Sequence, residues 1–220
     1  MKKICTQCGA EFEREAIVCF EKVFESLPCQ KCMDENGKVR RLEREKQDQE
    51  KRMIDWLRFC PPAFRETEME KLPKKSVTDH ALKWEFGRRG IVLFGPTRSG
   101  KTRTAWLLLK KMHMQGKRIM VMDSMSGFEY GAVFAHGSPL DWVNERVGCE
   151  LLFMDDVFKV KLTDSFEAAL FAIIDKRMNF RRPIIATLND TGETLAARMT
   201  DDRGNAFIAR LKEMCDTVVF

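Results

Sequence analysis

The sequence predicts an α/β fold, in which a five-stranded parallel sheet carries helices on both faces and follows a small N-terminal metal-binding module. Three observations predict it. Short apolar segments alternate with helix-like segments from residue 77 onward, a glycine-bearing loop follows the first of these apolar segments, and two CxxC pairs lie within the first 32 residues. Strands that alternate with helices are typical of parallel sheets, because a parallel connection must cross back over the sheet.

Length and charge narrow the class of protein. A chain of 220 residues holds one α/β domain and a small appendage. Its net charge of +5 permits a local basic patch but does not by itself indicate a nucleic-acid-binding protein. No apolar run is long enough to span a bilayer, and no apolar core follows the N-terminal lysines as it would in a secretory signal. We therefore expect a cytoplasmic protein with no membrane partner.

The paired cysteines predict a zinc site. Cys5 and Cys8 form one CxxC, Cys29 and Cys32 form a second, and 20 residues separate the pairs. Each pair directs two thiolates to one metal, so that two pairs complete a tetrahedral Zn²⁺ site. Redox use is the alternative, but redox CxxC motifs occur singly. Four thiolates leave no ligand position open, so we expect a structural site on a binding module. The other cysteines are expected to be buried: Cys19, Cys60, Cys149 and Cys215.

Three regions follow from these patterns. Residues 1–37 are the predicted four-cysteine zinc-binding module, which ends at the turn sequence DENG. Residues 38–59 are a predicted charged helical linker, and residues 60–220 are the predicted α/β domain. The last residue, Phe220, falls in the fifth predicted strand, so that no segment of this sequence is left for a helical lid.

The linker is expected to be solvated at its centre, because no apolar residue occurs from 43 to 52 and its charges are of both signs. Its end is expected to dock on the domain. The prolines of the CPP sequence then stop the helix, and the chain to about Ser76 is expected to be extended. The predicted docking residues are Met53, Ile54, Trp56 and Leu57.

The strands and the main helices of the domain are read from short apolar runs and from longer mixed segments between them. The predicted strands are Ile91–Phe94, Arg118–Asp123, Glu150–Met154, Ile184–Leu188 and Thr217–Phe220, and the predicted helices include Lys101–Gln115 and Asp164–Asn179.

The loop GPTRSGKT fits the phosphate-binding pattern GxxxxGK[ST], and it stands between an apolar strand and a helix, as that pattern requires. Backbone amides of the loop and of the helix N-terminus point at phosphates, and the glycines allow close approach. Lys101 is expected to contact the β and γ phosphates, and Thr102 to offer a hydroxyl to Mg²⁺. Arg98 stands where many such loops carry glycine. The predicted nucleotide-binding residues are Gly95, Pro96, Thr97, Arg98, Ser99, Gly100, Lys101, Thr102 and Arg103.

Two further strand ends carry polar groups suited to ATP hydrolysis. The sequence ELLFMDDVF is a Walker B pattern, in which Asp155 holds Mg²⁺ directly or through water and Asp156 polarises the attacking water. In PIIATLND, Asn189 is the candidate to sense the γ-phosphate or to orient the water, and Thr187 is the second candidate. A plain strand-to-loop cap is the alternative for this end.

Arginines near the C-terminus could reach the nucleotide of a neighbouring subunit. Arg210 and Arg203 are the candidates for such an arginine finger, and ordinary positions on a helix surface are the alternative for each. Arg177, Arg181 and Arg182 form a cluster that could serve a subunit interface.

The segment SGFEYGAVFAHGSPLDW could expose aromatic rings that stack on bases. We favour a buried aromatic loop instead. The aromatic residues concerned are Phe128, Tyr130 and Phe134.

Together, GPTRSGKTRTAWLLL, LLFMDDVF, IIDKRMNFRRPIIATLND and ARLKEM resemble the DnaC-type and IstB-type AAA+ ATPases of phages and bacteria. The resemblance covers about residues 60–220. Its more specific part is the DKR and RRP arrangement before the TxN strand end. The resemblance implies a P-loop AAA+ domain of the ASCE class without a lid domain, and ATP and Mg²⁺ as cofactors. Arg210 matches the arginine of the family's arginine–leucine helix, but Ala206 stands where some relatives carry another arginine.

The resemblance also implies a function. DnaC-type proteins are replicative helicase loaders, so the expected partners are a hexameric helicase, single-stranded DNA and, with ATP, further copies of the chain. The zinc module favours the loader, because it suggests a dedicated protein partner. An IstB-like transposition helper on duplex DNA is the alternative. A non-hydrolysing ATP-gated adaptor and a small-molecule kinase are further alternatives, the first suggested by Arg98 and by the short side chain of Asp156.

Overall fold

The computed structural model describes residues 2–13, 17–19, 22–24, 28–159, 162–189 and 191–220, which divide into the compact units Met1–Ile54 and Asp55–Phe220. The first unit contains β1 (Lys2–Ile4), β2 (Glu11–Glu13), β3 (Ile17–Cys19), β4 (Lys22–Phe24) and most of α1 (Gln30–Phe59). The second contains α2 (Pro62–Arg65), the 3₁₀ turn η1 (Met69–Lys71), α3 (Lys75–Leu82), β5 (Gly90–Phe94), α4 (Lys101–Met114), β6 (Ile119–Met122), α5 (Ser126–His136), α6 (Pro139–Gly148), β7 (Leu151–Asp155), the 3₁₀ turn η2 (Val157–Lys159), α7 (Asp164–Asn179), β8 (Ile184–Leu188), α8 (Gly192–Ala196), α9 (Asp201–Met214) and β9 (Cys215–Val219).

A five-stranded parallel sheet forms the centre of the second unit, with the strand order β6-β7-β8-β5-β9. The predicted α/β fold and its five strands are confirmed, and β8 and α7 have the predicted bounds. Parallel order brings all carboxyl ends of the strands to one edge, where β5 and β7 end at the predicted phosphate loop and the predicted acidic pair. Sheet topology therefore gathers the candidate site residues.

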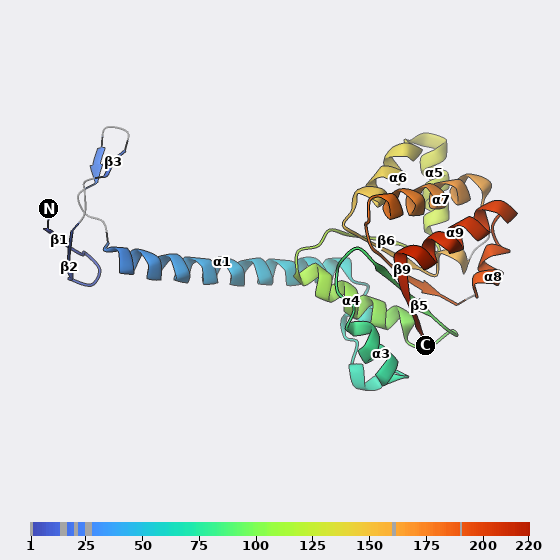
Figure 1. Cartoon of the computed structure of the whole chain (residues 1–220), viewed down its shortest axis with the longest axis horizontal. Helices are drawn as coiled ribbons and strands as arrows, with labels where there is room; N and C mark the ends of the chain where they lie inside the picture. The colour runs from blue at the N-terminus through green and yellow to red at the C-terminus, as the bar shows by residue number, and fades with distance from the viewer. Residues whose placement is uncertain (1, 14–16, 20–21, 25–27, 160–161, 190) are drawn as a thin grey trace. The chain divides into compact units, whose positions relative to one another are not determined.

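Helices cover both faces of this sheet, because strand residues alternate between two buried clusters. Ile91 and Leu93 of β5 pack with α3, α4 and the end of α1, whereas Val92 packs with the cluster of α5, α6, α7 and α9. Leu151 and Leu152 of β7 divide in the same way. Figure 1 shows α3 and α4 on one side of the sheet, and α5, α6, α7 and α9 on the other.

The helix α1 begins at Gln30, eight residues before the predicted linker, so the DENG sequence lies inside a helix and is not a turn. The carbonyl of Cys29 accepts from the Met33 amide at 2.9 Å, which starts the helical hydrogen bonding within the second CxxC. A glycine inside a helix costs about 1 kcal/mol, which the long helix tolerates. The centre of α1 is exposed as predicted.

The end of α1 docks through fewer residues than predicted. Trp56 is buried and lies against Trp106 of α4, with 5.8 Å between the ring centroids. The other three predicted docking residues stay exposed, because only one stripe of the helix faces α4. They are Met53, Ile54 and Leu57, at 37%, 53% and 46% exposure.

The prediction of an extended chain after α1 is wrong. This segment forms α2, η1 and the start of α3. Pro62 opens α2 at a first-turn position, where a proline has no helical hydrogen bond to lose. The same prolines that end α1 therefore begin the next helix.

The predicted aromatic loop is also helical, forming α5 and the start of α6. Tyr130 is buried against Trp142, whereas Phe128 and Phe134 are 66% and 59% exposed. The prediction of a buried loop is wrong for these two rings, since one helix face cannot bury all three aromatic side chains.

Arg177 belongs to the core and not to a surface cluster. Its side chain is fully buried, and its guanidinium donates to carbonyls that include those of Arg146, Cys149 and Pro183. Arg182 donates to the carbonyl of Val147. Arg177 therefore ties α7 to the loops before β7 and β8, and an interface role for it is excluded by burial.

No helix of the described residues has both the length and the apolar character needed to cross a membrane.

Candidate functional site

The phosphate-binding loop takes the backbone path that its glycines permit. Gly95 follows β5 directly, and a Cβ atom there would lie 2.3 Å from the carbonyl oxygen of Phe220, so no larger residue fits. Gly100 has a φ of +99° and caps the N-terminus of α4, a conformation that favours glycine. Arg98 has a φ of +64°, the left-handed conformation that is uncommon for a residue with a side chain.

Lys101 stands at the start of α4 and points back into the loop. Its Nζ donates to the carbonyls of Gly95 and Pro96 and to Oδ1 of Asn189, each at 2.8 Å. The side chain is 5% exposed, and burial lowers the pKa of its ammonium group against the opposing effect of Asp156 and Asp155. The structure thus places the predicted phosphate cation inside the loop.

The predicted magnesium ligands meet at the edge of the sheet. The hydroxyl of Thr102 donates to Oδ1 of Asp155 at 2.9 Å, and Thr187 donates to the same oxygen at 2.7 Å. Burial raises the pKa of Asp155, and the hydrogen bonds from Thr187 and Thr102 oppose that rise. A hydroxyl and a carboxylate side by side are oxygen ligands of the kind that Mg²⁺ prefers, so these residues fit the metal.

Asn189 joins the loop to the second acid. Its Oδ1 accepts from Lys101, and its Nδ2 donates to Oδ1 of Asp156 at 2.7 Å. Thr187 has no exposed surface, and its bonds go to the two acids. Of the two sensor candidates, only Asn189 lines the cavity beside the phosphate-binding loop.

A cavity of about 350 Å³ opens beside the loop. Besides loop residues, Asp156 and Asn189, its lining includes Phe64, Leu72 and Pro73 from the segment between α1 and α3. Phe64 stacks on Trp106 with the ring planes 10° apart. Sequence reasoning missed this apolar wall because it predicted an extended segment here, although the cluster of prolines and apolar residues before the first strand was a signal for packing.

The two candidate arginines lie on α9, outside the lining of the cavity. Arg210 is part of the packing of α9 on α7: its Nε donates to Asp175 at 2.7 Å, and its guanidinium lies 4.5 Å from the ring centroid of Phe171. Arg203 is exposed in the first turn of α9.

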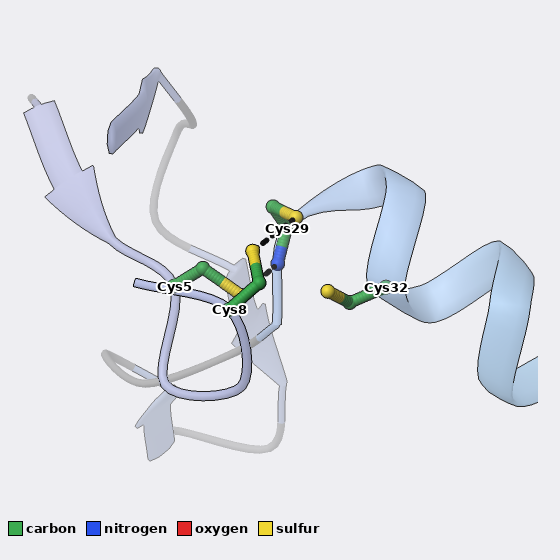
Figure 2. A group of neighbouring side chains, drawn as sticks. All are labelled: Cys5, Cys8, Cys29 and Cys32. Atoms are coloured by element: carbon green, nitrogen blue, oxygen red, sulfur yellow. Dashed lines mark hydrogen bonds between the residues drawn. The ribbon is translucent and has the colours of Figure 1, made fainter. Parts of the chain in front are cut away.

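The first unit brings the four paired cysteines together. The sulfur atoms of Cys5, Cys8, Cys29 and Cys32 all lie within 4.8 Å of one another. Figure 2 shows the first pair on the loop after β1, with Cys29 and Cys32 at the start of α1. The Sγ atoms of Cys8 and Cys29 are 3.7 Å apart, close to the edge of about 3.8 Å that a tetrahedron with Zn–S distances of about 2.3 Å requires. The donor set therefore fits Zn²⁺.

Backbone amides support this cluster. The amides of Cys29 and Gln7 donate to Sγ of Cys5 at 3.2 and 3.5 Å. The Cys29 bond and then the amide of Cys8 lower the pKa of Cys5 to about 6, which favours its thiolate, the form that binds metal. Cys60, Cys149 and Cys215 are buried as predicted, and the side chain of Cys19 lies outside the described residues.

No protein-family model matches the sequence, and neither does any curated protein. Solved structures do match. A DnaC helicase loader has a TM-score of 0.59 at 18% identity, covering 73% of this chain and 99% of its own, and DnaI has a TM-score of 0.57 at 14% identity, covering 73% and 91%. The replication initiator DnaA, bound to AMPPCP and single-stranded DNA, has a TM-score of 0.57 at 17% identity.

The chain covers about half of that DnaA chain, 51%, whereas the match takes in 74% of the present sequence. At these identities the likeness shows the fold alone. The second unit therefore has the fold of the DnaC and DnaI structures, as the resemblance implied.

Proposed function

We propose that this chain binds and hydrolyses ATP and uses it to place a hexameric replicative helicase on single-stranded DNA. The observation that supports ATP chemistry most strongly is the unbroken series of contacts from Lys101 through Asn189 to Asp156, beside a cavity lined by the phosphate loop. A cation, a polar sensor and an acid are thus positioned together where a γ-phosphate would lie.

Each group has a proposed part in the reaction. Lys101 and the loop amides bind and orient the phosphates, and Mg²⁺ held by Thr102 and Asp155 would neutralise developing charge. Asp156 accepts a proton from, or orients, the attacking water, and Asn189 holds the Asp156 carboxylate beside Lys101. The wall of Phe64 and Leu72 offers apolar surface to the base.

The solved structures with a similar fold support the choice of a helicase and single-stranded DNA as partners. One is named a helicase loader, and another is a replication initiator with single-stranded DNA bound. We extend those partners to this chain as a proposal. We propose that the zinc module binds the helicase, because a closed four-thiolate site offers a rigid surface and no open metal position.

ATP is further proposed to join copies of the chain by placing an arginine of one copy at the nucleotide of the next. Arg203 suits this part better than Arg210, because Asp175 already engages the Arg210 guanidinium. A single copy would then hydrolyse ATP slowly, since the stabilising arginine comes from its neighbour.

The test uses Asp156→Asn. The amide keeps an oxygen that can accept from Asn189, so binding geometry is retained, but the charge that acts on water is lost. We expect tagged Asp156→Asn protein, captured with ATP from the native host, to retain a hexameric replicative helicase. The helicase should be lost when Cys5 and Cys8 are also changed to Ser, and absent with Lys101→Ala.

Capture of a transposase with duplex DNA, and no helicase, would replace the loader with the transposition helper. Capture of neither a helicase nor a transposase would contradict both proposed functions.

A further inference from the structure

Thr187 lies at the point where the two acids of the site meet the neighbouring strand. In the register of the parallel pair β7 and β8, Asp155 stands opposite Thr187. The Thr187 hydroxyl donates to Oδ1 of Asp155 at 2.7 Å and accepts from the backbone amide of Asp156 at 3.1 Å. A single buried oxygen atom therefore contacts both acids.

The direction of these bonds follows from what each group can offer. A backbone amide can only donate, so the hydroxyl oxygen of Thr187 accepts from Asp156. The one hydroxyl hydrogen then goes to the Asp155 carboxylate, and it makes that bond inside the core, where Thr187 has no exposed surface. A side chain without a hydroxyl would leave the Asp156 amide without this partner.

The bond to the amide bears on a strained residue. Asp156 has a φ of +49°, a left-handed conformation that a side chain makes unfavourable. Such a conformation persists only where surrounding contacts hold it. The amide is held by Thr187 and the carboxylate by Asn189, two residues further along the chain. Positions i and i+2 share one face of an extended chain, which explains the Thr-x-Asn spacing at this strand end.

We propose that Thr187 is a positioning residue, which fixes Asp155 for Mg²⁺ and turns the backbone of Asp156 so that its carboxylate faces the attacking water. This inference rests on the proposed ATPase function and deepens it. It replaces the expectation that Thr187 senses the γ-phosphate, because the hydroxyl contacts the acids and the residue does not line the cavity.

The test compares Thr187→Val with Thr187→Ser. Valine keeps the shape and the strand preference of threonine but has no hydroxyl, and serine keeps the hydroxyl. We expect Thr187→Val to lower kcat by roughly 10- to 100-fold, the usual cost of removing a group that orients a metal ligand. Thr187→Ser should recover most of the lost rate.

A second readout needs no turnover. Calorimetry with AMPPCP gives the affinity without Mg²⁺ and the tightening that Mg²⁺ adds. We expect Thr187→Val to bind AMPPCP like the wild type when Mg²⁺ is absent and to lose most of the Mg²⁺-dependent tightening. Thermal unfolding followed by circular dichroism checks that the variants are folded. If the valine variant does not fold, Thr187→Ala is compared with Thr187→Ser, since these differ by the hydroxyl alone.

The outcomes separate the two proposals. If the wild type neither binds AMPPCP nor hydrolyses ATP, the proposed function fails, and the inference fails with it. If the wild type is active and Thr187→Val matches it in kcat and in the Mg²⁺ effect, only the inference fails. Equal losses in the serine and valine variants would also overturn it, because packing and not the hydroxyl would then be responsible.

Discussion

Lys101→Ala is expected to lower ATP turnover by roughly 100- to 1,000-fold, the range found when one preorganised charge-stabilising group is removed from an active site. The side chain is buried beside the loop and makes three hydrogen bonds of 2.8 Å, two to loop carbonyls and one to Asn189. Alanine removes the cation that would meet the phosphates and also frees Asn189. Phosphate release at saturating ATP measures the loss of turnover, and AMPPCP titration measures the loss of nucleotide binding.

Lys111→Ala is the matched control. Lys111 is exposed and lies ten residues further along α4, about 15 Å from Lys101 at 1.5 Å per residue. It should bind and hydrolyse ATP like the wild type. If Lys101→Ala retained full turnover, the cavity beside the loop would not be the site of ATP hydrolysis.

The double change Cys5→Ser/Cys29→Ser is expected to reduce bound zinc from about one ion per chain to almost none, because serine is a poor zinc ligand and a small module gains much of its folding free energy from the metal. One ligand is lost from each CxxC pair. Metal analysis of the purified protein gives the stoichiometry, and limited proteolysis should show faster cleavage within the first unit.

Cys60→Ala serves as the control for this change, since Cys60 is buried in the second unit and lies outside the cluster. The Cys60→Ala variant should retain about one zinc ion per chain. ATP turnover should survive the double change, because the second unit has its own core. Zinc that stays bound to the double variant would contradict the assignment of the cluster as its ligands.

The sequence was most informative for motifs whose geometry is determined by residues close together along the chain. The phosphate loop between an apolar strand and a helix, the acidic strand end and the CxxC pairs were all predictable, because spacing along the chain fixes their geometry. The order of the strands in the sheet makes these local patterns into a site, by placing Asn189 beside Lys101 and Asp156.

The rest depends on contacts between distant parts of the chain. Phe64 and Leu72 line the cavity only because the segment between α1 and α3 folds back onto the domain. The prolines of this segment led to the prediction of an extended chain. Arg177 was predicted to be a surface cation, but its guanidinium donates to five carbonyl groups in two segments, residues 146–150 and Pro183. The part of Thr187 could not be read from sequence, because it depends on the register between β7 and β8.

We propose that ATP drives the placing of a ring helicase on DNA. The most direct measurement mixes the chain, the replicative helicase of its host and circular single-stranded DNA, and follows helicase in the DNA-bound fraction. Circular DNA has no end for a ring to thread, so loading needs an opened ring. We expect DNA-bound helicase only when the wild-type chain and ATP are both present, and little with Lys101→Ala. Equal loading without the chain, or with Lys101→Ala, would contradict it.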